Sequence, residues 1–183
     1  MAGVNGPVLS PGNVPVVRSQ SWHSVPPFGG FSSANVPDGR LFALPLWPGR
    51  RCLITGVAVN VTLALAGGNL RFGLYTQGNG LPLTRVADFG TVTSGVLGVR
   101  QITGLRTRLA CSLHFVCVAR QGGVLNLGLT SRDTWDPLIS ETTPALAANL
   151  SAYYIDGVAG ALPSSFGAPA GTVQGPSISV QLM

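Results

Sequence analysis

The sequence predicts an all-β protein, an antiparallel β-sandwich with an extended Pro/Gly-rich N-terminal arm. Among its 183 residues are 25 Gly and 14 Pro, spread without the period of collagen, which indicates many turns between short elements. Because 45% of the residues are hydrophobic and only 9% are charged, a disordered chain is excluded. Residues 51–66 alternate with period two, which is typical of a half-buried antiparallel strand. In that strand the residues predicted to face the core are Val57, Val59, Val61, Leu63 and Leu65.

Further strands are predicted at 40–47, 69–77, 84–93, 96–103, 106–120, 124–130 and 177–183, separated by turns rich in Gly. In the second of these, Leu70, Phe72 and Leu74 are predicted to face inward, and Arg71 and Tyr75 to face outward. Treated as one strand, 106–120 places Cys111 and Cys117 on the same face, roughly 20 Å apart. That distance is too long for a disulfide, so the cysteines are interpreted as small buried hydrophobic residues.

The composition divides the chain into an arm, residues 1–38, and a sandwich domain, residues 39–183. The arm is rich in Pro, Gly, Ser and Asn, which rules out a helix and restricts it to extended or edge positions. Apolar residues occur along it, so we expect it to lie against its own domain or a neighbouring subunit, and at least partial contact with a neighbour is favoured. The predicted arm anchors for assembly are Val16, Trp22, Phe28 and Phe31.

The chain has few charged residues, and most of them are basic. All 11 basic residues are Arg, against six acids, for a formal net charge of +5. The Arg are scattered and only Arg50 and Arg51 are adjacent, so the sequence predicts protein interfaces and no nucleic-acid partner. A surface with so little charge favours a protein that buries much of its outside against neighbours.

No catalytic motif is found. The two histidines, His23 and His114, stand apart, and no metal-binding pair, nucleophile elbow or phosphate-binding loop is present. We therefore predict no enzyme, no cofactor and no metal centre. Asp133 and Asp136 lie in a loop with Glu141, where a Ca²⁺ site is the weaker alternative to turn capping by Asp136 and local pairing of Asp133 with Arg132.

Trp135, Tyr153 and Tyr154 form the other candidate contact group. Their rings suit either stacking on sugars or anchoring a subunit interface, and the interface is favoured. No charged leader precedes an apolar run, and no apolar stretch approaches 18 residues. We therefore expect no signal peptide and no membrane insertion.

Three stretches resemble a known family. Leu70–Thr91 contains Arg-x-Gly-Leu-Tyr, then Asn-Gly-x-Pro, then Ala-Asp-Phe-Gly-Thr, an order that resembles a recurring stretch of tailed-phage virion proteins. Thr103–Gln121 resembles the next strand of that family, and Tyr154–Phe166 resembles a Gly-Val-x-Gly-Ala-Leu-Pro signature of phage minor tail or fibre-like proteins. The resemblance spans roughly residues 50–183.

The resemblance implies a jelly-roll-like sandwich, often a homotrimer, in minor tail proteins, fibre heads or capsid decoration. No collagen-like or coiled-coil stalk precedes the domain, so a compact knob or decoration subunit, tethered by its arm, is as consistent as a fibre. The expected location is the particle surface, after synthesis in the host cytoplasm, with partners among copies of itself and other capsid or tail proteins. The alternative is a carbohydrate-binding module that recognises a host surface glycan through the aromatic loop.

Overall fold

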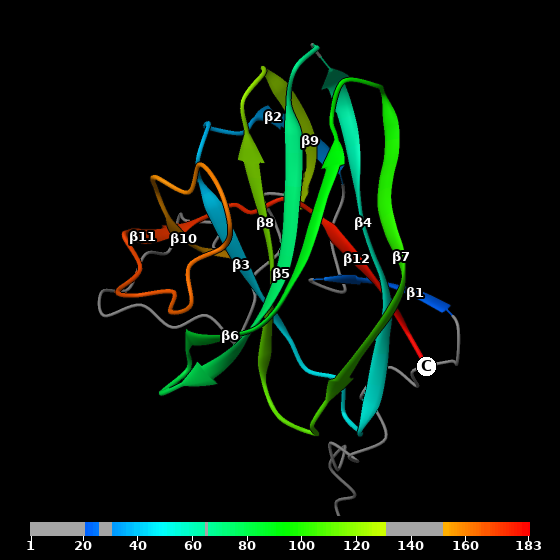
Figure 1. The fold of residues 1–183 in the computed structure, drawn as a ribbon, viewed down its shortest axis with the longest axis vertical. Coiled ribbons are helices and arrows are strands. Elements are labelled where there is room, and N and C mark those ends of the chain that lie inside the picture. Colours follow the sequence, from blue (N-terminus) through cyan, green and yellow to red (C-terminus); the bar gives the residue numbers. More distant parts are fainter. Residues whose placement is uncertain (1–20, 26–30, 65, 131–151) are drawn as a thin grey trace, which may run out of the picture.

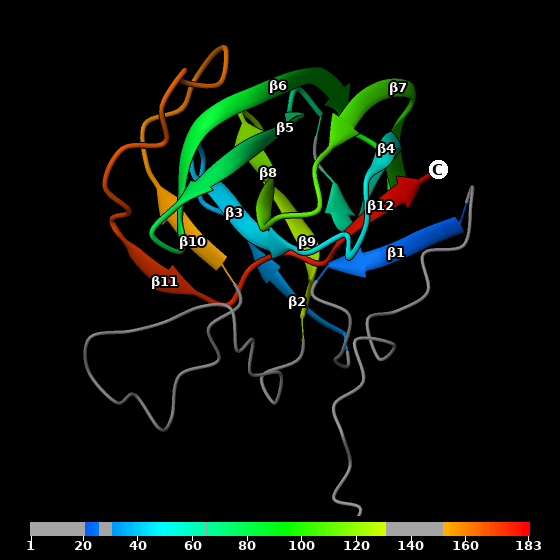
Figure 2. The same cartoon turned by 90° about the horizontal axis from the view of Figure 1, so that it is seen from below.

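The computed structural model describes residues 21–25, 31–64, 66–130 and 152–183. These residues form two antiparallel sheets packed face to face, with no helix among them (Figures 1 and 2). The prediction of an all-β antiparallel sandwich is confirmed. No described helix is long and apolar enough to cross a membrane.

Each sheet contains six strands. In the first sheet the strands are β1 (Ser21–Val25), β12 (Ile178–Leu182), β4 (Cys52–Ala64), β9 (Leu125–Thr130) and β2 (Phe31–Asn35), with β7 (Gly98–Leu109) on the other edge of β4. The second sheet has the order β11 (Gly171–Val173), β10 (Ala152–Ile155), β3 (Leu41–Leu46), β8 (His114–Gln121), β5 (Asn69–Gly78) and β6 (Leu81–Thr93).

Eight of these strands have the connectivity of a jelly roll. Strands β2, β9, β4 and β7 form one four-stranded sheet and β3, β8, β5 and β6 form the other. From β2 to β9 every connection crosses between the sheets except the β5–β6 hairpin, whose turn has Asn79 and Gly80 at positive φ. This is the double Greek key in which two sheets share one core. The expected jelly-roll-like sandwich is therefore what the structure contains.

The described part of the arm joins this sandwich. Strand β1 pairs with β12 over its whole length, and β2 pairs with β9 from Phe31–Thr130 to Asn35–Asn126. Strand β2 is thus the outermost strand of the first jelly-roll sheet. The expectation that the arm is extended holds for these two segments, and both pack against the chain's own domain.

The core has two parts. The main cluster fills the space between the sheets and includes Leu70, Phe72 and Leu74, as predicted. A second cluster lies on the outer face of the second sheet, where Tyr75, Phe115 and other residues are covered by the segment 158–166. Strand β8 is consequently buried on both faces, which explains its nearly continuous apolar sequence.

Two sequence predictions about strands are wrong. The predicted strands 96–103 and 106–120 are divided differently: Gly98–Leu109 is one strand, β7, after which the chain turns and crosses to the other sheet as β8. Cys111 lies exposed in that turn while Cys117 is buried on β8, so the two do not share a strand face. In β4 the register shifts between Val61 and Leu63, and Leu63 is 45% exposed instead of facing the core.

Candidate functional site

One end of the sandwich exposes a group of aliphatic side chains. Three turns meet there: Ser94 N–H donates to the Gly68 carbonyl over 2.9 Å, and Gly123 lies against Gly67 and Gly68. The side chains around these turns are 41–61% exposed. We call this group the apolar end, and it consists of Leu63, Val96, Leu97, Val99 and Val124.

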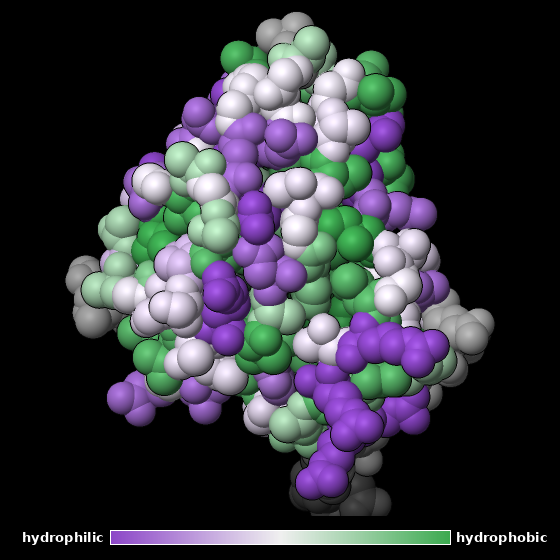
Figure 3. Space-filling model, in the orientation of Figure 1, coloured by the Kyte–Doolittle hydropathy of each residue, from purple (hydrophilic) through white to green (hydrophobic). Residues whose placement is uncertain are grey.

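Single exposed aliphatic residues are ordinary, but a gathering of them at one end of a soluble domain indicates a contact surface. The turns that carry them are the upper tips in Figure 1, and apolar side chains are seen there in the space-filling view (Figure 3). Leu63 and Val99 lie on the two strands β4 and β7, while Val96 and Leu97 come from the turn that leads into β7. The rigid sheet therefore positions the group.

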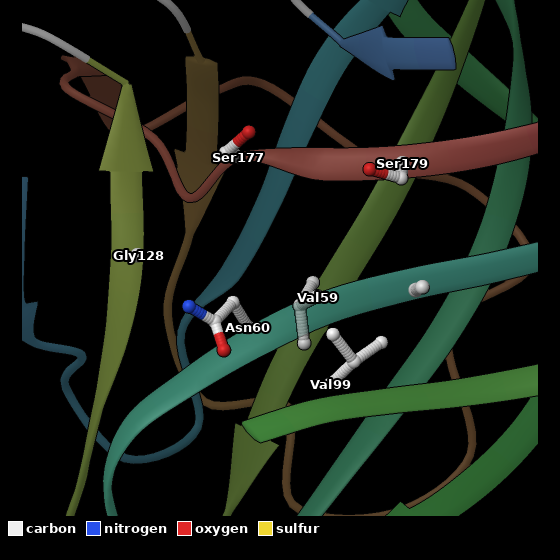
Figure 4. A pocket seen from close by; sticks show the side chains of 7 residues that line it. Val59, Asn60, Val99, Gly128, Ser177 and Ser179 are labelled. Atoms are coloured by element: carbon white, nitrogen blue, oxygen red, sulfur yellow. The ribbon is translucent and has the colours of Figure 1, made fainter. Parts of the chain in front are cut away.

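A shallow hollow adjoins the apolar end on the outer face of the first sheet (Figure 4). It lies where β4 changes neighbours, from β12 along Ile54–Val59 to β9 along Val61–Ala64. The hydrogen bond from Ser177 N–H to the Gly128 carbonyl, 2.9 Å long, joins the two neighbours at this fork. The hollow has a volume of about 270 Å³ and is lined by Ala58, Val59, Asn60, Val99, Gly128, Ser177 and Ser179.

The lining determines what the hollow can do. It contains no titratable side chain that could act as a general acid or base or activate a serine, and its polar groups are one amide and the two hydroxyls of Ser177 and Ser179. The hollow exists because the side chains that line it are small, and Val99 belongs both to its lining and to the apolar end. The geometry suits an uncharged side chain from another protein seated beside a hydrophobic contact.

Elsewhere, the described residues hold no group of three or more His, Cys, Asp or Glu that could bind a metal ion. His114 is buried, and its Nδ1 lies 2.8 Å from the Ser112 carbonyl oxygen. Burial raises the pKa of the Cys117 thiol well above its ordinary value, and it also raises that of Cys52. These two cysteines are therefore poor nucleophiles.

The predicted aromatic contact group is only partly described. Tyr153 is 3% exposed and packs edge-on against Phe115, with ring centroids 5.9 Å apart. This corrects its assignment as a contact residue: β10 lies between β11 and β3, and its Tyr153 belongs to the second core cluster. Three other predicted contact residues, Trp135, Asp133 and Asp136, lie outside the described residues.

Tyr154 is half-buried and already has a partner. The Arg40 guanidinium lies 4.0 Å from the centre of its ring, a cation–π contact. Arg40 also donates from Nε to Asp156 Oδ1 over 2.7 Å and from a terminal nitrogen to Oδ2 over 3.1 Å. The hydrogen bond from Arg40 lowers the pKa of Asp156. Tyr154 therefore packs within an Arg–Asp pair that ties β10 to the start of β3.

Of the predicted arm anchors, Trp22 is the one whose side chain the structure describes. It projects from β1 onto the outer face of the first sheet, where its ring covers Gly56 and remains 40% exposed. A Cβ at Gly56 would come within 2.8 Å of the ring, so Gly56 provides the space for it. Val16 and Phe28 lie outside the described residues, as does the side chain of Phe31.

Two of the stretches that carry the family resemblance pack against each other. Asp88 accepts hydrogen bonds from Leu162 N–H and Gly90 N–H, 3.1 and 3.0 Å long, and from Arg71 Nε. Partial burial acts to raise the pKa of Asp88, but these hydrogen bonds outweigh it and the pKa is lowered. Tyr75 donates to the Pro163 carbonyl over 2.7 Å, and Arg85 donates to that of Leu162.

These contacts form a clamp that holds 157–166 over strands β5 and β6. The sequence motifs therefore have a structural role, because their polar residues fasten the layer that covers the second core cluster. Spacing alone did not indicate this, since the two stretches are separated by more than 60 residues. No protein-family model matches the chain, and no curated protein is similar enough to it to count as a relative.

Proposed function

We propose that this chain is a structural subunit of a bacteriophage particle, a small surface subunit that assembles with copies of itself, as a trimer, and with other capsid or tail proteins. The observation that carries the proposal is the apolar end with its adjoining hollow on a jelly-roll sandwich. The five exposed aliphatic residues form a surface that contact with another subunit stabilises, and the Arg100 guanidinium lies beside them, where it donates to the carbonyls of Val96 and Leu97.

Composition supports the same proposal. A chain with 9% charged residues and no Lys keeps few groups that maintain solubility at high concentration. The jelly roll is found in viral capsid proteins and in lectins, among others, and a fold by itself does not define a function. The sequence resemblance to tailed-phage virion proteins supports the viral alternative.

The carbohydrate-binding alternative, which uses the loop aromatics, receives no support from Tyr153 and Tyr154, the two of these residues that are described. Tyr153 is in the core and Tyr154 is stacked under Arg40, so neither offers a free ring face for a sugar. We therefore propose only the structural role.

The test is the oligomeric state. We expect the purified chain to form trimers in sedimentation equilibrium at micromolar concentration, and Leu97→Asp to shift it to monomers because a carboxylate is placed in the apolar end. Val86→Asp, at a similarly exposed aliphatic residue of β6, is the matched control and should leave the trimer intact. A wild-type monomer, or equal effects of both variants, would contradict self-assembly through this end.

Location on a particle is the second measurement. Antibodies raised against the chain, used for immunogold labelling of virus particles from the host that carries its gene, should decorate the particle surface. Labelling of heads without tails indicates capsid decoration, and labelling of tails indicates a tail protein. Absence of the chain from purified particles would overturn the viral assignment.

A further inference from the structure

Four arginines gather at the end of the sandwich opposite the apolar end, although the scatter of arginines along the sequence predicted no nucleic-acid partner. Arg106 and Arg108 are exposed near the end of β7, two residues apart on the outer face of the first sheet. Strand pairing places Arg108 opposite Leu53 of β4, and Arg50 and Arg51 immediately precede that strand. Hydrophilic side chains cluster in this region at the lower right of Figure 3. We call this group of four residues the basic end.

The described acidic residues lie elsewhere. Asp88 pairs with Arg71, Asp156 pairs with Arg40, and Asp38 accepts a hydrogen bond from Gly122 N–H. Arg51, Arg106 and Arg108 take part in no ion pair among the described residues. Among the described residues no acidic group faces the basic end, and the guanidinium groups of Arg51, Arg106 and Arg108 suit an anionic partner.

An exposed aromatic ring shares this face. The ring of Trp22 covers Gly56, which lies three residues from Leu53, so the ring is roughly 10 Å along β4 from the level of Arg108. Gly56 pairs with Thr103 of β7, and Arg106 lies between Thr103 and Arg108 on that strand. The outer face of β4 and β7 thus presents an aromatic surface followed by a row of guanidinium groups.

We propose that this face binds a single strand of nucleic acid, with phosphates on Arg51, Arg106 and Arg108 and a base stacked on Trp22. Guanidinium groups bind phosphate oxygens in a bidentate manner, and Arg106 and Arg108 stand about 7 Å apart along an extended strand. An exposed aromatic ring beside a basic track on an open sheet is the arrangement that single-stranded nucleic acid uses. An acidic peptide accounts for the arginines but gives no role to the ring. This proposal does not depend on the proposed virion role.

The test is the binding of a fluorescein-labelled 15-nucleotide oligo(dT) to the full chain, followed by fluorescence anisotropy between 25 and 200 mM salt. With about three phosphate contacts, log Kd should vary with log salt concentration with a slope of about 2. Arg106→Gln with Arg108→Gln should weaken binding about tenfold and lower that slope by about 1.4. Arg100→Gln is the matched control, because it removes one charge from the other end of β7, and it should leave both quantities nearly unchanged.

Trp22→Ala should weaken binding about tenfold, whereas Trp22→Phe, which retains a stacking ring, should restore most of it. Thermal melting of each variant separates loss of the ring from loss of the fold. Polyglutamate of matched charge is the competitor: it should displace the oligonucleotide poorly. The proposal is overturned by no binding at 25 mM salt, by an equal effect of Arg100→Gln, or by competition from polyglutamate as effective as from unlabelled oligonucleotide, which would indicate an acidic protein partner.

Discussion

Replacing Gly73 by Ala tests whether the clamp over the second sheet is as closely packed as its geometry indicates. Gly73 is a buried residue of β5, and a Cβ built on it would overlap Leu162 Cδ1 and lie 2.8 Å from the Ala87 carbonyl oxygen. The leucine side chain is 2% exposed in the second core cluster and has little room to move away. The carbonyl belongs to the paired strand β6 and moves only with its backbone.

The two contacts have separate costs. Overpacking a closely packed site costs about 1–3 kcal/mol, so we expect Gly73→Ala to lower the free energy of unfolding by about 2 kcal/mol. Leu162→Ala leaves a cavity beneath the covering segment and should cost about 3 kcal/mol. In the double variant the overlap with the leucine is gone and the contact with the Ala87 carbonyl remains. The double variant should therefore be more stable than the sum of the single effects predicts, by about 1 kcal/mol.

Urea unfolding followed by far-UV circular dichroism measures all four proteins of this cycle. The slope of the free energy against urea concentration must be the same in each, so that the midpoints report stability alone. A distant pair provides the control: Gly73→Ala combined with Leu97→Asp should be additive, since Leu97 lies in the turn before β7 of the other sheet. Strict additivity of Gly73→Ala and Leu162→Ala would show that the two residues do not compete for the same space, and the reasoning would fail.

Two further predictions concern polar groups. Arg120 is a buried arginine that donates to the Asn35 side chain and to the carbonyls of Val36, Gly122 and Gly123. Arg120→Met should lower the free energy of unfolding by about 2 kcal/mol, because those acceptors lose their donor. Urea unfolding measures this change. The pKa of Asp88 is lower in the folded chain than in the unfolded chain, so ionised Asp88 stabilises the fold at pH values above its unfolded pKa. This stabilisation is lost as the pH falls through the folded pKa of Asp88. Asp88→Asn should therefore flatten the decline of thermal stability between about pH 5 and pH 2; an unchanged decline would assign it to other groups.

The predictions made from the sequence succeeded where one face of a strand decides burial. Alternation placed Val57, Val59 and Val61 of β4, and Leu70, Phe72 and Leu74 of β5, in the core, because a sheet covered on one face requires period two. It failed for Tyr75, predicted to face outward and fully buried, because the segment that covers that face is itself irregular. A strand pattern carries no information about a second layer formed by a loop some 90 residues away.

The candidate surfaces were harder to predict for a different reason. Each is made of residues that are distant in the sequence. Leu63 lies at the end of β4 that pairs with β9, which Val124 immediately precedes. Arg51 immediately precedes β4, and Arg108 pairs with Leu53 of that strand. In the sequence, Arg50 and Arg51 are the only adjacent charged residues of the basic end, and no run of apolar residues marks the apolar end. Topology is the missing information, since the jelly-roll order decides which strands become neighbours.

The apolar end and the basic end lie at opposite ends of strand β7. Its 12 residues span about 40 Å from Gly98, beside the apolar end, to Leu109, beside the basic end. That distance exceeds several Debye lengths at physiological salt, so a charge change at one end has little direct electrostatic effect at the other. The proposed assembly at the apolar end leaves the basic end uncovered, so the proposed contacts at the two ends do not compete. In the two proposals taken together, one end of the sandwich holds neighbouring subunits and the other end engages an anionic strand, and these two proposed roles are separable by mutation because they share no residue.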